Sequence, residues 1–91
     1  MVNEQQIQLN NGEGLHARPA GLFVKTAAQF KSVIEVELNG VRKNGKSIMS
    51  LMSLGAARGD TLKVIAKGDD SEVAVATLIK LISNNFTILE S

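Results

Sequence analysis

The chain has 91 residues, of which 44% are hydrophobic and 21% charged, and its formal net charge is +1. This length predicts one domain over residues 1–91, and the composition is typical of a globular fold rather than a disordered chain. The balanced charge and the three aromatic residues, all Phe, argue against nucleic-acid binding through a basic face or through stacked bases. With no cysteine and one histidine, the chain has no disulfide framework and no thiolate or multi-histidine metal site.

The first third of the chain predicts a strand, a loop and a helix. Apolar and polar residues alternate over residues 5–10, as in a half-buried strand. The Gly-rich connection 11-NGEGLHARP-19 follows. Apolar side chains then recur at steps of three and four from Ala17 to Phe30, which predicts an amphipathic helix. Pro19 fits its first turn, where a backbone N–H has no helical partner.

The middle of the chain predicts a hairpin and a short helix. Residues 33–38 alternate like a second strand, and Asn39-Gly40 favours a two-residue hairpin because both residues tolerate a positive φ. Residues 41–44 would then form the returning strand. Ser47 suits the N-cap of a helix that ends at Gly55.

The last third predicts a strand and a longer helix. Residues 62–66 alternate, 68-GDD-70 closes the strand, and an apolar periodicity runs to Phe86 from a cap at Asp70 or Ser71. The order β-α-β-β-α-β-α predicts an α+β fold, an open-faced two-layer sandwich. In it, three helices cover one face of a sheet of four strands that is largely antiparallel, and the alternation of the strands leaves the other face wet.

The stretch 40-GVRKNGKS-47 matches the nucleotide-binding pattern G-x-x-x-x-G-K-[ST]. That motif needs a buried parallel strand before it and a long helix after it. Here the preceding strand carries Glu35 and Glu37, Asn39-Gly40 favours a hairpin, and the following helix is short. We therefore interpret the match as a hairpin followed by a helix cap. The alternative, a nucleotide site, predicts saturable, magnesium-dependent ATP binding.

The single histidine lies in 14-GLHARPAG-21, just before the predicted helix. The positive end of a helix dipole disfavours an imidazolium there, which leaves a ring nitrogen free to act as a nucleophile. The same dipole and the free amides of the first turn stabilise an anion. Arg18 adds a permanent cation with the fork geometry that suits phosphate. These groups suit reversible transfer of a phosphoryl group to His16, although a surface histidine near a helix start is the simpler reading of His16 alone.

Two segments of the chain resemble signatures of one family. The stretch 14-GLHARPA-20 resembles the active-site signature of HPr, the histidine-containing phosphocarrier of the bacterial sugar phosphotransferase system. The stretch 46-KSIM-49, with Met52, Leu54 and Gly55, resembles the family's second signature, a regulatory serine segment. The spacing of the two segments, the element order and the length also fit, so the resemblance covers nearly the whole chain.

The resemblance implies a four-stranded antiparallel sheet under three helices and a role as a phosphoryl carrier without turnover of its own. Enzyme I, charged by phosphoenolpyruvate, would phosphorylate Nδ1 of His16, and the group would pass to a histidine of the IIA component of a sugar permease. Arg18 would stabilise the phosphorylated state, with the backbone amides of Ala17 and Arg18 as donors. The expected protein is a cytoplasmic monomer with no cofactor, no metal and no membrane insertion.

Ser47 corresponds to the serine that an ATP-dependent HPr kinase/phosphorylase modifies in Gram-positive members of the family. The resemblance therefore implies a second role in carbon catabolite repression, with a catabolite repressor protein as a further partner. A phosphate at a helix N-cap meets free amides and is locally tolerated, so we expect phosphorylation to act on docking.

The helix after Ser47 carries more apolar residues than one buried face needs. We expect Leu51 and Leu54 to face the core, and Ile48, Met49 and Met52 to form an exposed, adaptable patch. The resemblance assigns this patch to docking of enzyme I and IIA. The alternative is that all five residues belong to the core.

Some positions depart from the family pattern. Glu13 stands where a small polar residue is more usual, so its carboxylate either points away from a phosphohistidine or shortens its lifetime. Gly21 lowers helix stability, and Gly45 is expected to loosen the approach to the Ser47 cap. The tail 87-TILES-91 has no assigned burial. A purely regulatory HPr-like module is the alternative function, and the presence of His16 disfavours it because relatives of that kind lack this histidine.

Overall fold

The computed structural model describes residues 1–87, so the apolar residues Ile88 and Leu89 of the tail lie outside the described residues. The elements follow in the predicted order β-α-β-β-α-β-α. The strands are β1 (Val2–Gln8), β2 (Val33–Leu38), β3 (Val41–Asn44) and β4 (Thr61–Lys67). The helices are α1 (Ala17–Ala27), α2 (Ile48–Ser53) and α3 (Ser71–Ser83).

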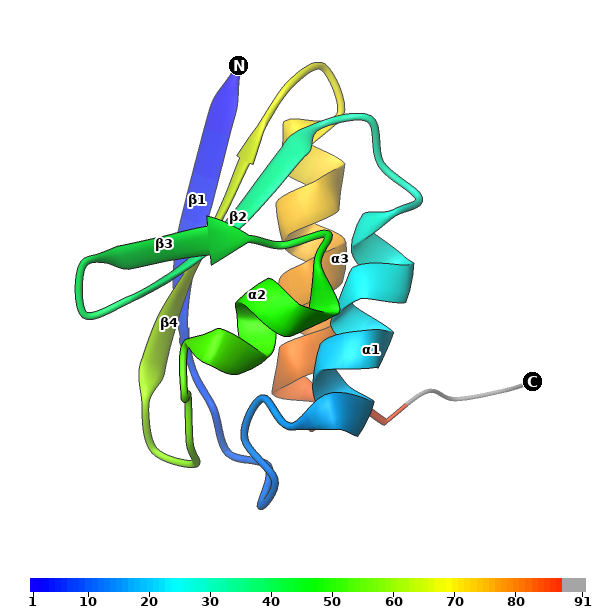
Figure 1. The fold of residues 1–91 in the computed structure, drawn as a ribbon. Helices are drawn as coiled ribbons and strands as arrows, with labels where there is room; N and C mark the ends of the chain where they lie inside the picture. Colours follow the sequence, from blue (N-terminus) through cyan, green and yellow to red (C-terminus); the bar gives the residue numbers. More distant parts are fainter. Residues whose placement is uncertain (88–91) are drawn as a thin grey trace.

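The four strands form one sheet in the order β1-β4-β2-β3, and every neighbouring pair is antiparallel. All three helices lie on the same side of this sheet (Figure 1). The predicted open-faced two-layer sandwich is therefore confirmed. The sheet alternates as expected: in β2, Ile34, Val36 and Leu38 are buried under the helices.

The other face of the sheet carries a ladder of ion pairs. Arg42 Nε lies 2.7 Å from Glu37 Oε1, and Lys63 Nζ lies 3.6 Å from Glu37 Oε2. Glu4, Glu35 and Lys67 extend the same ladder across the strands. The hydrogen bond from Arg42 holds the pKa of Glu37 below its ordinary value. These side chains explain why the exposed halves of the strands are charged, and they confirm the prediction of a wet face.

The hairpin between β2 and β3 turns at Asn39 and Gly40, whose φ values are +52° and +83°. Both residues therefore adopt the left-handed conformation that a two-residue hairpin requires. Gly40 and Ser47 consequently lie at opposite ends of β3, and β2 runs antiparallel to β3. A phosphate-cradling loop cannot form from this segment, so the hairpin interpretation of 40-GVRKNGKS-47 is confirmed.

The ends of several elements differ from the prediction. The first strand covers residues 2–8 rather than 5–10. Helix α1 ends at Ala27, three residues before the half-buried Phe30. Helix α3 ends at Ser83 because Asn85 and Phe86 have positive φ, and the Phe86 amide donates to the Leu81 carbonyl at 2.9 Å.

An apolar residue can belong to the core without belonging to the helix whose periodicity it continues. Phe86 is only 1% exposed although it follows the helix, and Phe30 packs against the same core. Periodicity therefore predicted burial correctly at both positions and predicted the helix ends wrongly.

The start of α3 is built differently from the predicted cap. Asp70 occupies the N-cap position, but its side chain makes no capping bond. Its carboxylate instead accepts hydrogen bonds from the Lys31 amide (2.8 Å), the Ser32 amide (3.0 Å) and the Ser32 hydroxyl. Asp70 thus ties the start of α3 to the residues that lead into β2. Of the helices within residues 1–87, none is long and apolar enough to cross a membrane.

Candidate functional site

The loop before α1 is a hydrogen-bonded turn. The Gly14 amide donates to the Asn11 carbonyl at 3.3 Å, and the Asn11 side-chain amide donates back to the Gly14 carbonyl at 2.9 Å. Asn11 is buried, whereas Gly12 and Glu13 between the two ends are exposed. These bonds fix the position of Glu13 at the tip of the turn.

Gly14 and Leu15 hold this loop against the segment that follows α2. The Leu15 amide donates to the Ala56 carbonyl at 3.0 Å. Gly14 has a φ of +60°, and a Cβ at this position would lie 2.4 Å from the Ala56 carbonyl oxygen. Only glycine allows this approach. Leu15 is 4% exposed and anchors the loop in the core.

His16 occupies the N-cap position of α1, with an extended backbone at φ −74° and ψ −174°. Its side chain is exposed and makes no capping hydrogen bond. The first helical bond runs from the Ala20 amide to the His16 carbonyl at 2.9 Å, and Pro19 has no amide hydrogen. The amides of Ala17 and Arg18 therefore precede the first helical hydrogen bond.

The Arg18 guanidinium is held by two partners. Its Nη2 and Nε atoms lie 2.9 Å and 3.2 Å from the same Glu13 oxygen, Oε1. Its Nη1 atom makes a longer, 3.5 Å contact with the Phe86 carbonyl oxygen. Both members of the ion pair are about half exposed, 54% for Arg18 and 51% for Glu13. The Glu13 carboxylate is therefore turned toward Arg18.

Ser47 is the N-cap of α2, as predicted. Its backbone is extended, and its Oγ accepts a hydrogen bond from the Ser50 amide at 3.2 Å. The Leu51 amide donates to the Ser47 carbonyl at 3.1 Å. The hydroxyl therefore satisfies one of the free amides at the helix start.

The apolar residues of α2 divide between the core and the surface as predicted. Leu51 is fully buried and Leu54 packs against the core. Ile48 and Met52 are each 43% exposed, and Met49 is 82% exposed. We refer to Ile48, Met49 and Met52 as the α2 patch. The alternative that all five residues are core is wrong.

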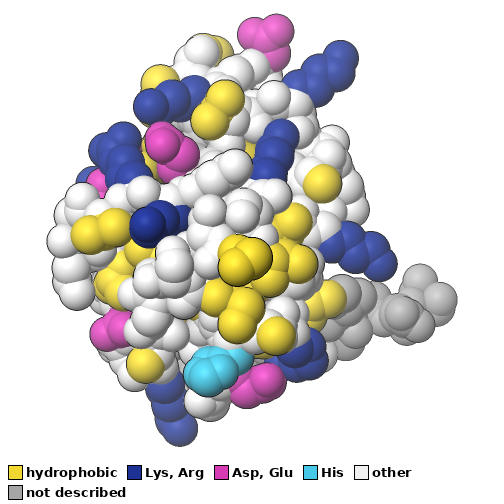
Figure 2. All heavy atoms as spheres, in the orientation of Figure 1, with side chains coloured by type: hydrophobic (Ala, Val, Ile, Leu, Met, Phe, Trp, Pro, Cys, Tyr) yellow, Lys and Arg dark blue, Asp and Glu magenta, His cyan; other side chains and the backbone are white. Residues whose placement is uncertain are grey.

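The histidine and the α2 patch meet on one surface. Figure 2 shows the histidine beside a group of hydrophobic side chains on the face that α2 forms. A hollow of about 210 Å³ lies between the two motifs, and it is lined by Leu15, His16, Met52, Gly55, Ala56 and Ala57. The structure thus brings together residues that are more than thirty positions apart in the sequence.

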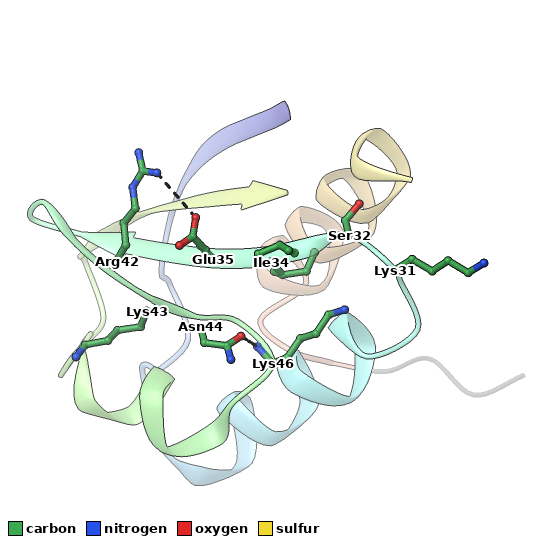
Figure 3. A pocket seen from close by; sticks show the side chains of 9 residues that line it. Lys31, Ser32, Ile34, Glu35, Arg42, Lys43, Asn44 and Lys46 are labelled. Atoms are coloured by element: carbon green, nitrogen blue, oxygen red, sulfur yellow. Dashed lines mark hydrogen bonds and ion pairs between the residues drawn. The ribbon is translucent and has the colours of Figure 1, made fainter. Parts of the chain in front are cut away.

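A larger hollow of about 340 Å³ lies elsewhere, where the start of β2 and the end of β3 diverge. Figure 3 shows that it contains none of the predicted site residues. Two of its cations already have partners: Lys46 Nζ donates to the Phe30 carbonyl at 2.6 Å, and Arg42 pairs with Glu37. Within residues 1–87, no group of three His, Asp or Glu side chains could hold a metal ion.

Sequence reasoning missed three contributors to the site. Asn11 fixes the turn, Ala56 holds the loop through its carbonyl, and Phe86 contacts Arg18 through its carbonyl. The Asn-Gly pair at 11–12 is a turn signal that could have indicated the first. The other two act through backbone oxygens, which leave no trace in residue identity.

The sequence matches the family model described as the PTS HPr component phosphorylation site over residues 3–84. It is 44% identical over 79 residues to the HPr-like protein Crh of Halalkalibacterium halodurans, covering 87% of this chain and 94% of that protein. It is 45% identical over 83 residues to the phosphocarrier protein HPr of Neisseria meningitidis, covering 91% of this chain and 93% of that protein.

Solved structures of HPr proteins also match this chain. The crystal structure of an HPr from Thermoanaerobacter tengcongensis superposes with a TM-score of 0.90 at 49% identity, covering 92% of this chain and 94% of that one. An HPr dimer from the same organism gives a TM-score of 0.76 over 90% of this chain and 94% of that one. The family match, the two relatives and the shared fold lead to one conclusion: this chain belongs to the HPr family of phosphocarriers of the phosphotransferase system.

Proposed function

We propose that this protein carries a phosphoryl group on His16, accepting it from enzyme I and passing it to IIA components of sugar permeases. One observation supports this more than any other. The exposed imidazole of His16 stands at the start of α1, ahead of two backbone amides and two residues before Arg18. Family membership supplies the reaction class, since the matching protein of Neisseria meningitidis is a phosphocarrier.

The chemistry is a transfer between two histidines. The lone pair of Nδ1 of His16 attacks phosphorus, the N–P bond of the phosphorylated donor breaks, and the electron pair of that bond returns to the donor imidazole. The group arriving on His16 carries negative charge beside the start of α1. The amides of Ala17 and Arg18 and the helix dipole stabilise it there, and the Arg18 guanidinium adds a charge-assisted hydrogen bond.

The reaction calls for no metal or cofactor and for no turnover by this chain alone. Enzyme I draws the group from phosphoenolpyruvate, and the carrier delivers it to the next protein. We place the protein in the cytoplasm, because enzyme I and the IIA components would phosphorylate incoming sugars on the cytoplasmic side of the membrane.

Phosphorylation by purified enzyme I and labelled phosphoenolpyruvate tests the proposal. The wild-type protein should acquire one acid-labile phosphate, and His16→Ala should acquire none. A serine phosphate is acid-stable, so Ser47→Ala is the matched control and should label like the wild type. Full labelling of His16→Ala would exclude His16 as the acceptor.

We further propose that Ser47 is a regulatory phosphorylation site and that the α2 patch docks the partners. Ser47 is half-buried at the helix start, next to the exposed Ile48 and Met49. A phosphate there would place about two negative charges beside an apolar surface. Partners that bury this surface would have to desolvate the phosphate, so binding would weaken.

An HPr kinase/phosphorylase with ATP should place an acid-stable phosphate on the wild type and none on Ser47→Ala. The phosphorylated protein should accept a phosphoryl group from enzyme I more slowly, mainly through a raised KM, because docking rather than chemistry is affected. A raised KM of enzyme I for Met49→Lys would support the α2 patch as the docking surface. An unchanged KM in both proteins would remove the α2 patch from the docking site.

Similarity to the HPr-like protein Crh favours a second candidate function, regulation without carrier activity. In that case Ser47 phosphorylation would promote binding to a catabolite repressor protein, and His16 would not be used. The enzyme I experiment separates the two functions, because a purely regulatory protein would remain unlabelled at His16 while the kinase still modified Ser47.

A further inference from the structure

The Glu13–Arg18 ion pair occupies the guanidinium that the proposed function needs for the phosphoryl group. Two of the guanidinium's nitrogens, Nε and Nη2, face the Glu13 carboxylate, and the third, Nη1, faces the Phe86 carbonyl. All three nitrogen atoms of Arg18 thus have partners in the unphosphorylated protein. A phosphoryl group on His16 that binds Arg18 therefore replaces Glu13 as the partner of the guanidinium or shares its charge with Glu13.

The turn holds Glu13 in place for this contact. Two hydrogen bonds between Asn11 and Gly14 close the turn, and the Leu15 amide ties it to Ala56. The backbone on either side of Glu13 is therefore fixed before any charge appears on His16. Because the pair is half exposed, its net strength is that of a surface ion pair, which is weak.

On this basis we propose that Glu13 is a positioning residue that holds Arg18 in the unphosphorylated carrier and so lowers the stability of the phosphorylated form. The inference rests on the proposed function of His16. When His16 gains the phosphoryl group, Arg18 either leaves Glu13 or shares its charge between two anions. Both outcomes favour giving the group away, so Glu13 makes the carrier a better donor to the next protein.

The first test needs no partner enzyme. The Arg18 Nε–H signal is followed by ¹⁵N NMR in the unphosphorylated protein. In the wild type, its chemical shift should differ from that of a free arginine side chain, because Nε donates to Glu13. Glu13→Gln should move the signal toward the free value, whereas Glu72→Gln should leave it unchanged.

Glu72 is a matched control because it loses the same charge far from the site. It is an exposed residue in the first turn of α3. That end of α3 is tied through Asp70 to Lys31 and Ser32, beyond the last residue of α1, whereas His16 lies before the first. An Arg18 signal that is identical in wild type and Glu13→Gln would overturn the inference.

The second test measures the transfer equilibrium between phosphorylated enzyme I and the carrier. Glu13→Gln should shift it toward the phosphorylated carrier by about 1.5- to five-fold, the range that a surface ion pair provides. The shift should shrink in an Arg18→Gln background, because Glu13 acts through Arg18. An equal shift in both backgrounds, or no shift in either, would contradict the proposed role.

The two tests separate failure of the inference from failure of the proposed function. A wild-type protein that enzyme I does not label would refute the carrier function, and the NMR experiment would still report on the ion pair. A wild type that labels normally, with Glu13→Gln behaving identically, would refute only the role of Glu13.

Discussion

Gly21 and Gly45 differ in how much space the structure leaves for a side chain at each position. Gly21 lies inside α1, and a Cβ there would have Ile48 Cδ1 as its nearest neighbour, at 4.0 Å. Gly45 follows β3, and a Cβ there would lie 2.6 Å from Ile34 Cγ2 and 3.1 Å from the Ile34 carbonyl oxygen. The sequence suggested that Gly45 loosens the approach to the Ser47 cap, and this prediction is wrong. Gly45 lets the chain pack directly on β2, where its amide donates to Ile34.

Alanine at these two positions should change stability in opposite directions. Gly21→Ala should raise the free energy of unfolding by about 0.5–1 kcal/mol, since alanine favours the helix and its methyl group would clash with no neighbouring atom. Gly45→Ala should lower it by about 1–3 kcal/mol, because the methyl group overpacks Ile34. Urea denaturation of the wild type and both variants measures these changes in the free energy of unfolding. A stabilised Gly45→Ala protein would show that the contact with Ile34 relaxes at no cost.

At the scale of elements, Asp70 joins α3 to the start of β2. It accepts hydrogen bonds from the Ser32 hydroxyl and from the amides of Lys31 and Ser32. The Ser32 hydroxyl and the Lys31 amide hold the pKa of Asp70 below its ordinary value. This connection fixes the far ends of α1 and α3 relative to the sheet, and thereby the scaffold on which the His16 loop rests.

The Asp70 contribution to stability should depend on pH in a defined direction. Because the folded-state pKa is lowered, the carboxylate stabilises the fold above the unfolded value of about 3.9. That contribution is lost as the pH falls through the folded value. Asp70→Asn should therefore be less stable than the wild type at pH 7, and the difference should narrow as the pH falls below about 4. Urea midpoints at pH 7 and at pH 3 test this; a constant difference would contradict it.

At the scale of the whole molecule, one core supports both functional segments. Residues from β2, β4 and all three helices belong to a single buried cluster, including Phe23, Leu51, Val64, Leu78 and Phe86. The His16 loop enters this cluster through Leu15, and α2 enters it through Leu51. The site is therefore stable only when the entire fold is stable.

We expect one cooperative unfolding transition and a monomer in solution. Fluorescence is of little use without Trp or Tyr, so far-UV circular dichroism and NMR should be compared and should give the same midpoint. That midpoint should not depend on protein concentration, as it would for a dimer. The related HPr structure described as a dimer makes the second measurement informative. Separate transitions would contradict a single domain, and a concentration-dependent midpoint would contradict the monomer.

The sequence alone determined the element order, the antiparallel open-faced sheet and the division of α2 into buried and exposed residues. These follow from local rules, because alternation, helical periodicity and the Asn39-Gly40 turn act over a few neighbouring residues. The His16 and Ser47 caps were also predictable, since each capping position is defined by the helix that follows it.

Only the tertiary structure decided what these residues contact. Phe86 leaves the helix yet joins the core, Asp70 binds a distant loop instead of capping α3, and Gly45 packs on Ile34. The Glu13–Arg18 pair depends on a turn closed by Asn11 and Gly14 and braced by the Ala56 carbonyl. Each of these contacts joins a side chain or a backbone group to a partner whose position is set by the packing of the sheet and helices. Local sequence carries no record of that packing, because a backbone carbonyl is the same in every residue.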